Sequence, residues 1–180
     1  MDHLAHYVRI HLTGAAAGIE LFGRGENLHD PEARRGVRAI RQELVEERTW
    51  LLDLVERLGA SDPTVPSLVA QVGEKIGRLK PNGSLVHRTA LTDVVDLEAM
   101  HDAVSGKVAG WRALLQVDDP RVDTEDVERL LAQGLRQLET LSAAHEEAAR
   151  RAFAASGTTP RSGPGWESVE PEEKFPRSHS

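Results

Sequence analysis

Four long segments of this chain repeat apolar residues at intervals of three and four positions, which is the period of an amphipathic α-helix. The segments cover residues 3–23, about 31–58, about 89–116 and about 123–155. Asp30-Pro31 is typical of a helix start and Gly59 of a helix end. Only 4% of the residues are aromatic, and the abundant Leu, Ala, Glu and Arg favour helix. The pattern predicts an all-α fold, an up-and-down four-helix bundle.

The connection between the second and third segments is much longer than a hairpin turn. Residues 59–88 are rich in Pro and Gly, and they contain a stretch with apolar residues on one side, Leu68, Val72, Ile76 and Leu79. About thirty residues exceed what an antiparallel helix pair needs. They can run the length of a bundle, which would make the third helix parallel to the second. We therefore expect a long crossover that contains a short helix.

The chain divides into one domain and a tail. Its 180 residues are typical of a single domain with an appendage. Residues 1–156 are predicted to form the bundle. Residues 157–180 are rich in Pro, Gly, Ser and charge without an apolar period, so we expect a disordered or surface-draped tail.

Composition excludes several function classes. The chain has no cysteine, which removes disulfides, iron–sulfur clusters and thiol catalysis. A net charge of -7 argues against a nucleic-acid partner. No apolar run is long enough for a bilayer span, and the N-terminus lacks the apolar core of a signal peptide. We expect a cytoplasmic protein without a membrane partner, and the excess of Arg over Lys is typical of a GC-rich bacterial genome.

Each long segment carries an ionisable residue near the middle of its apolar stripe: His11, Glu47, His101 and His145. Burying such groups is costly unless something compensates. Glu43 and Glu98 lie near the stripe edges, and the expected heights of all six residues along the bundle fall within about two helical turns. Mixed imidazole and carboxylate ligands suit Fe, Mn or Zn. The predicted metal ligands are therefore His11, Glu43, Glu47, Glu98, His101 and His145.

Residues 3–155 resemble the ferritin-like superfamily. The resemblance lies in the four helices, the long second connection and the E-x-x-H sequence from Glu98 to His101. It implies a di-iron centre built from one Glu on each of two helices and an E-x-x-H on each of the others. The chain departs from that pattern, because Trp50 and Ser142 stand where histidines are expected. The resemblance favours a divergent member of the fold.

Three functions remain open from the sequence. The first is a ferritin-like bundle that binds a metal ion in its core. The second is a non-catalytic interaction or scaffold protein with a degenerate, metal-free core, in which Glu47 pairs with Arg112 or with the histidines; its partner would be a second copy or another protein. The third is a metal-dependent hydrolase or isomerase. The sequence leaves open whether the protein is an enzyme.

Overall fold

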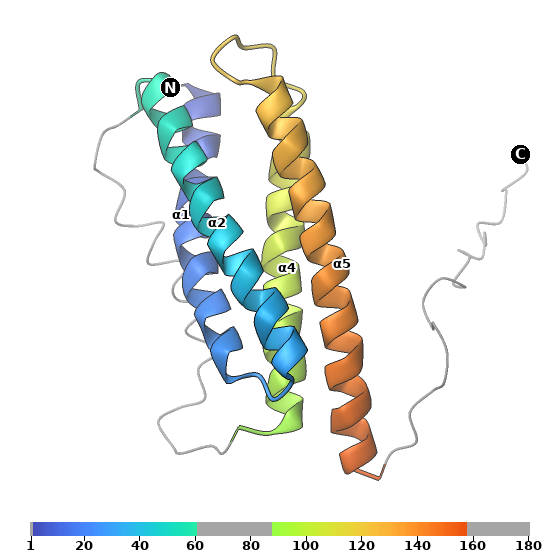
Figure 1. Cartoon of the computed structure of the whole chain (residues 1–180). Coiled ribbons are helices and arrows are strands. Elements are labelled where there is room, and N and C mark those ends of the chain that lie inside the picture. The colour runs from blue at the N-terminus through green and yellow to red at the C-terminus, as the bar shows by residue number, and fades with distance from the viewer. Residues whose placement is uncertain (1, 61–87, 158–180) are drawn as a thin grey trace, which may run out of the picture.

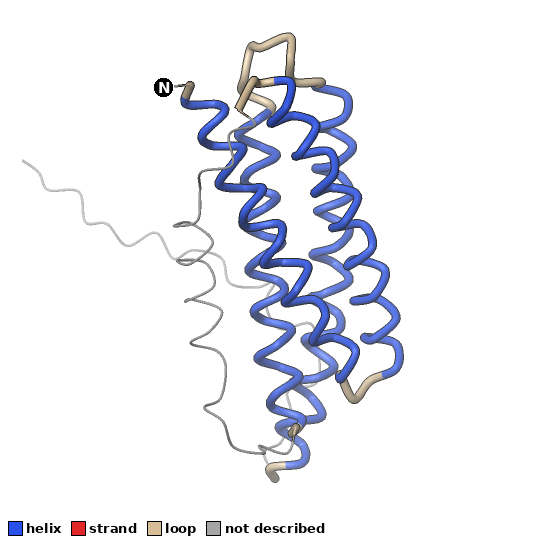
Figure 2. Tube along the Cα trace, turned by 90° about the vertical axis from the view of Figure 1, so that its left-hand side faces the viewer, coloured by secondary structure: helices blue, strands red, loops and turns tan. Residues whose placement is uncertain are grey.

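The computed structural model describes residues 2–60 and 88–157. Within these ranges the chain is helical, with no strand (Figure 2). Its elements are α1 (His3–Gly23), the short 3-10 helix η1 (Arg24–Asn27), α2 (Pro31–Arg57), α4 (Ala90–Leu114) and α5 (Thr124–Ala155). The four predicted helices are confirmed, with ends that differ by at most about two residues. The predicted crossover helix and the tail beyond Gly157 lie outside the described residues.

Local sequence signals set the helix ends. All four long helices begin at a residue whose side chain accepts a hydrogen bond from a backbone N–H of the first turn: Asp2, Asp30, Thr89 and Asp123. Such caps satisfy backbone donors that have no partner within the helix. After α2, Gly59 has a φ of 68°, a conformation that glycine adopts at little cost. These signals are short in range, which explains why the bounds could be predicted.

The helices form two antiparallel pairs, α1 with α2 and α4 with α5 (Figure 1). Helices α2 and α4 run in the same direction. His29, just before α2, contacts Asp93 near the start of α4, and Glu47 farther along α2 contacts Lys107 farther along α4. The end of α2 and the start of α4 therefore lie at opposite ends of the bundle. None of the described helices has the length and hydropathy needed to cross a membrane.

The core consists of two apolar clusters stacked along the bundle. One surrounds Phe22, Leu28, Leu97, Met100 and Leu141, and the other surrounds Val8, Leu54, Trp111, Val127 and Leu130. Gly134 brings α4 and α5 close together, because a Cβ built there would lie 2.8 Å from Val108 Cγ2. The interior also contains a polar layer around the buried Glu47 and Gln137, and this layer holds two of the predicted site residues, Glu43 and Glu47.

Candidate functional site: a buried polar layer

Glu47 is the most deeply buried of the predicted site residues, with only 2% of its surface exposed. It lies on α2 between the buried Leu44 and Leu51, so the helical period directs it inward. The ammonium of Lys107 on α4 donates to both carboxylate oxygens, at 2.8 Å to Oε1 and 2.7 Å to Oε2. The carboxylate is thus neutralised by a group from the opposite side of the bundle.

Two glutamines of α5 complete the network around this pair. The Nε2 atoms of Gln133 and Gln137 donate to Glu47 Oε1 at 3.0 and 3.1 Å. Gln137 Nε2 also donates to Glu43 Oε2 at 2.6 Å. The Oε1 of Gln137 accepts a hydrogen bond from Lys107. Amides and ammonium together satisfy the buried carboxylate, which would otherwise be costly in the interior. Helices α2, α4 and α5 are thereby joined through one layer of side chains.

Burial and neighbouring charge shift the pKa of Lys107 in opposite directions. Removal from water is the larger effect and lowers the pKa of the ammonium below its usual value, while the charge of Glu47, its hydrogen bond and the charge of Glu43 oppose that shift. A buried ion pair of this kind adds little net stability against an apolar replacement, but removal of one partner is expensive. The pair therefore makes each partner dependent on the presence of the other.

The sequence did not identify Lys107. The sequence suggests Arg112 or the histidines as partners of Glu47, and both alternatives are wrong: Lys107 takes the position, and Arg112 is exposed. A signal was present, because Lys107 is the single lysine within residues 2–60 and 88–157 and is flanked by Val104, Val108 and Trp111. Lysine presents a compact ammonium on a flexible stem, which differs in shape and reach from the planar guanidinium of arginine.

Glu98 and His145 meet near the surface, away from the buried layer. His145 Nε2 lies 3.1 Å from Glu98 Oε1, with 32% and 56% of the respective side chains exposed. A pair this exposed contributes little to stability. His101 is partly buried on the same helix as Glu98, and the described part of the chain offers its ring no hydrogen bond or ion pair. The E-x-x-H spacing thus does not bring Glu98 and His101 to a shared partner.

His11 packs between α1 and α4. Its ring is tilted against that of Tyr7, with centroids 4.7 Å apart. It also lies against Gly110, where a Cβ would come within 2.5 Å of the imidazole. Burial lowers the pKa of His11 below its usual value. These contacts explain how an imidazole is accommodated on an apolar stripe with no carboxylate partner among the described residues.

The arrangement does not fit a metal centre of the ferritin-like kind. No three of the His, Asp and Glu side chains in residues 2–60 and 88–157 come together in a group that could hold a metal ion. Trp50, which stands where a histidine is expected, donates from Nε1 to Asp126 Oδ2 at 3.0 Å and meets Trp111 edge-on. Four of the six predicted ligands form two separate pairs. Glu43 and Glu47 are linked through Gln137, and Glu98 contacts His145 directly.

Comparison of the chain with protein-family models, with curated proteins and with solved structures found no match in any of the three.

Proposed function

We propose that this chain is a divergent bundle of the ferritin-like type that acts as an interaction or scaffold protein. In this proposal the core cation is the ammonium of Lys107, and the core carries no metal chemistry. The parallel course of α2 and α4 supports the ferritin-like connectivity, because it demands a long connection between them. The protein acts through its surface, on another protein or on a second copy of itself.

The observation that carries the proposal is the closed set of bonds around Glu47. Both of its oxygens face the Lys107 ammonium, and two amides donate to Oε1. A metal ion at Glu47 would have to displace the ammonium and leave it buried without its partner, which is costly. A fully satisfied polar network makes a bundle rigid and specifies one alignment of its helices. Such a core suits a scaffold better than a reactive centre.

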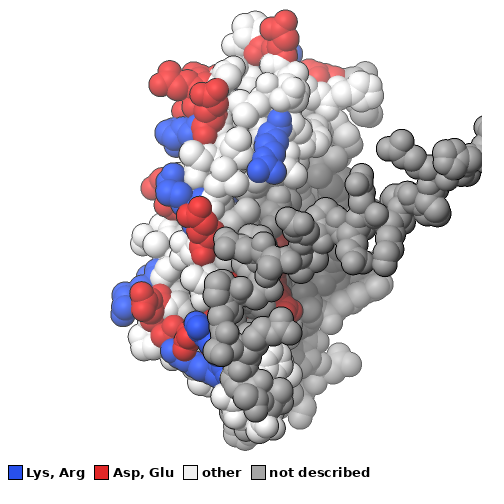
Figure 3. All heavy atoms as spheres, turned by 90° about the vertical axis from the view of Figure 1, so that its right-hand side faces the viewer, with Lys and Arg blue, Asp and Glu red and all other residues white. Residues whose placement is uncertain are grey.

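The surface supports a protein partner over a nucleic acid. On the face shown in Figure 3, Lys and Arg lie interspersed with Asp and Glu, so no broad basic area forms there. Leu91 and Val95 are exposed, at 53% and 41%, and they lie four residues apart on the outer face of α4. Residues at that spacing are neighbours on a helix surface. Exposed apolar side chains can contribute to the apolar centre of a protein interface.

Metal loading tests the proposal about the core. The full chain would be purified without a polyhistidine tag, incubated with Fe²⁺, Mn²⁺ and Zn²⁺ in turn, desalted and analysed for metal. We expect no stoichiometric metal from any of the three. One or two equivalents that disappear in a Glu47→Ala variant would overturn the proposal and support a metal site at the predicted ligands.

Sedimentation of the full chain at rising concentration tests the partner. A dimer would identify a second copy as the partner, and a Leu91→Asp variant that stays monomeric would place the contact on α4. If the protein stayed monomeric at every concentration, its partner would be a different protein. A dimer that the Leu91→Asp substitution leaves intact would overturn the assignment of the interface to the outer face of α4.

A further inference from the structure

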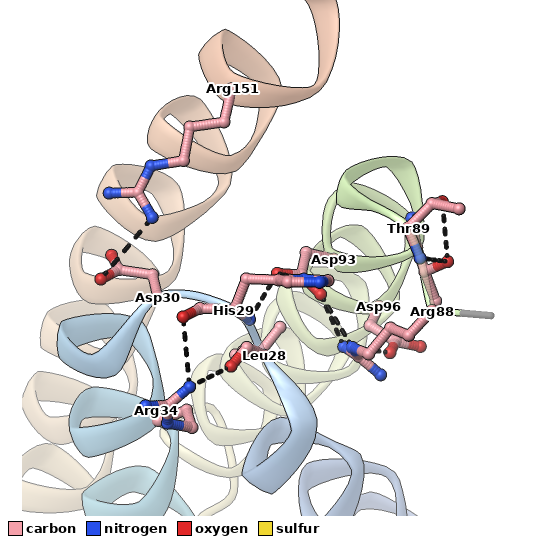
Figure 4. A network of polar contacts seen from close by, with 10 residues as sticks. Leu28, His29, Asp30, Arg34, Arg88, Thr89, Asp93, Asp96 and Arg151 are labelled. Carbon is pink, nitrogen blue, oxygen red and sulfur yellow. Dashed lines mark hydrogen bonds and ion pairs between the residues drawn. The ribbon is translucent and has the colours of Figure 1, made fainter. Parts of the chain in front are cut away.

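A second polar cluster lies at the end of the bundle where α2 and α4 begin (Figure 4). Its centre is the buried carboxylate of Asp93. Asp93 Oδ2 accepts from the backbone N–H of His29 at 2.8 Å and lies 3.0 Å from the His29 Nδ1. Arg88 donates from Nε to Asp93 Oδ1 at 2.9 Å, and its Nη2 lies 2.9 Å from Asp96 Oδ2. The cluster is independent of the layer around Glu47.

The contact with Asp93 orients the His29 ring. When Nδ1 carries the ring proton and donates it to the carboxylate, Nε2 presents a lone pair. The His29 side chain is 53% exposed, and no described residue forms a hydrogen bond with Nε2. An imidazole held through Nδ1 by a buried carboxylate, with the other nitrogen open, is how proteins prepare a histidine as a base or nucleophile.

A shallow depression adjoins this histidine. Its cavity volume is about 30 Å³, which is room for about two water molecules. Small apolar side chains form much of its lining, Leu28, Ala33, Leu97, Ala144 and Ala148, and Arg151 and Asp30 also line it. A group placed there would have apolar contacts on one side and the His29 ring on another. The space suits an acyl group as small as acetyl rather than an extended ligand.

The imidazole is not needed to hold the turn in place. The backbone N–H of His29 already ties the turn before α2 to Asp93, and Arg88 already supplies the positive charge that a buried carboxylate requires. A contact that only stabilises the turn would form with any residue at position 29 that carries a backbone N–H. The exposed nitrogen beside a hollow is the feature that a structural role leaves unexplained.

We propose that Nε2 of His29 is a nucleophile that accepts short acyl groups from activated acyl compounds bound in this depression. Nε2 attacks the carbonyl carbon and forms a C–N bond, while the bond from that carbon to the leaving oxygen breaks and releases an alkoxide, phenolate or carboxylate. The acylated ring loses its Nδ1 proton to the Asp93 carboxylate or to water. Water then hydrolyses the acylimidazole, giving a carboxylic acid and restoring the imidazole.

The first test measures the reactivity of each histidine. Diethyl pyrocarbonate transfers an ethoxyformyl group to imidazole nitrogen, and peptide mass spectrometry follows its rate at every site. We expect His29 to react several-fold faster than His3 and His6, which are also exposed, and we expect Asp93→Asn to remove that advantage while His3 and His6 keep their rates. A rate at His29 no higher than at His3 and His6 would overturn the proposal.

The second test uses p-nitrophenyl acetate and p-nitrophenyl butyrate with the full chain. His29→Asn should lose most of the catalysed release of p-nitrophenol, while His101→Asn should release it at the wild-type rate. Ala148→Leu, which fills the depression, should slow the butyrate ester more than the acetate ester. Circular dichroism confirms that each variant is folded, and neither His29→Asn nor Ala148→Leu removes the Asp93–Arg88 contact. Hydrolysis by His29→Asn at the wild-type rate would contradict the proposal.

Discussion

Glu47 of α2 and Lys107 of α4 meet inside the bundle, with Nζ 2.7 Å from Oε2 and 2.8 Å from Oε1. They come from helices that run in the same direction and that belong to different antiparallel pairs. The pair therefore joins the two halves of the molecule. Its energy depends on both partners being present, since either charge alone would be stranded between two apolar clusters.

Removal of the ammonium should be far more damaging than removal of an exposed charge nearby. Lys107→Met keeps the length of the side chain and leaves Glu47 buried without its cation, so we expect a loss of about 3–5 kcal/mol in the free energy of unfolding. Arg112→Met on the same helix is the matched control, and it should cost less than about 1 kcal/mol. Urea unfolding of the variants at neutral pH measures both.

Replacement of both partners should recover most of the loss. In a Glu47→Leu/Lys107→Met double variant no charge is stranded, so we expect stability within about 2 kcal/mol of the wild type. Equal losses for Lys107→Met and Arg112→Met would show that Glu47 does not depend on Lys107.

Two glycines on facing helices should respond to alanine in opposite directions. A Cβ at Gly134 would lie 2.8 Å from Val108 Cγ2, whereas a Cβ at Gly106 of α4 would meet nothing within 4 Å. We expect Gly134→Ala to destabilise the bundle by about 1–3 kcal/mol through overpacking. Gly106→Ala should stabilise it by up to about 1 kcal/mol, because alanine favours helix. If both substitutions shifted the thermal unfolding midpoint in the same direction, α4 and α5 would not approach each other closely at Gly134.

The burial of His11 gives stability a pH dependence of known sign. Burial lowers its pKa in the folded chain, so the unfolded chain binds more protons between the lowered value and the ordinary value of about 6.5. The contribution of His11 is therefore complete above about pH 6.5 and is lost as the pH falls through that window. Urea unfolding measures the free energy of unfolding at about pH 7.5 and about pH 5.5. Between the two pH values His11→Gln should lose less of it than the wild type. If His11→Gln and the wild type lost the same free energy of unfolding, the ring would not be buried against Gly110.

The helices could be predicted from the sequence because their signals are local. Asp30-Pro31 and the Thr89 cap act within one turn, and the apolar period is visible in each segment. The partner of Glu47 could not be predicted, because it depends on the rotation of α4 and on the reach of a flexible side chain. The sequence suggests Arg112 or the histidines, and Lys107 meets Glu47 instead.

The placement of the other candidate residues depended equally on tertiary structure. His145 is central on its own helix stripe, yet it ends near the surface, beside the exposed Glu98. In the sequence Asp93 looks like an ordinary first-turn acid, and Asp96 lies one turn farther along. In the fold both are buried and paired with Arg88 just before α4, and His29 and Arg24 reach them from earlier parts of the chain. Sequence periodicity shows which face a residue occupies, but not what is packed against that face.

Nuclear magnetic resonance of the lysine ammonium groups tests the Glu47–Lys107 pair most directly. Lysine labelled with ¹⁵N would report the Nζ of the four lysines in the chain. We expect one Nζ signal that exchanges slowly with water, disappears in Lys107→Met and moves in Glu47→Gln, as a buried and hydrogen-bonded ammonium requires. If all four signals exchanged rapidly with water, Lys107 would be solvated, and the buried pair would not exist.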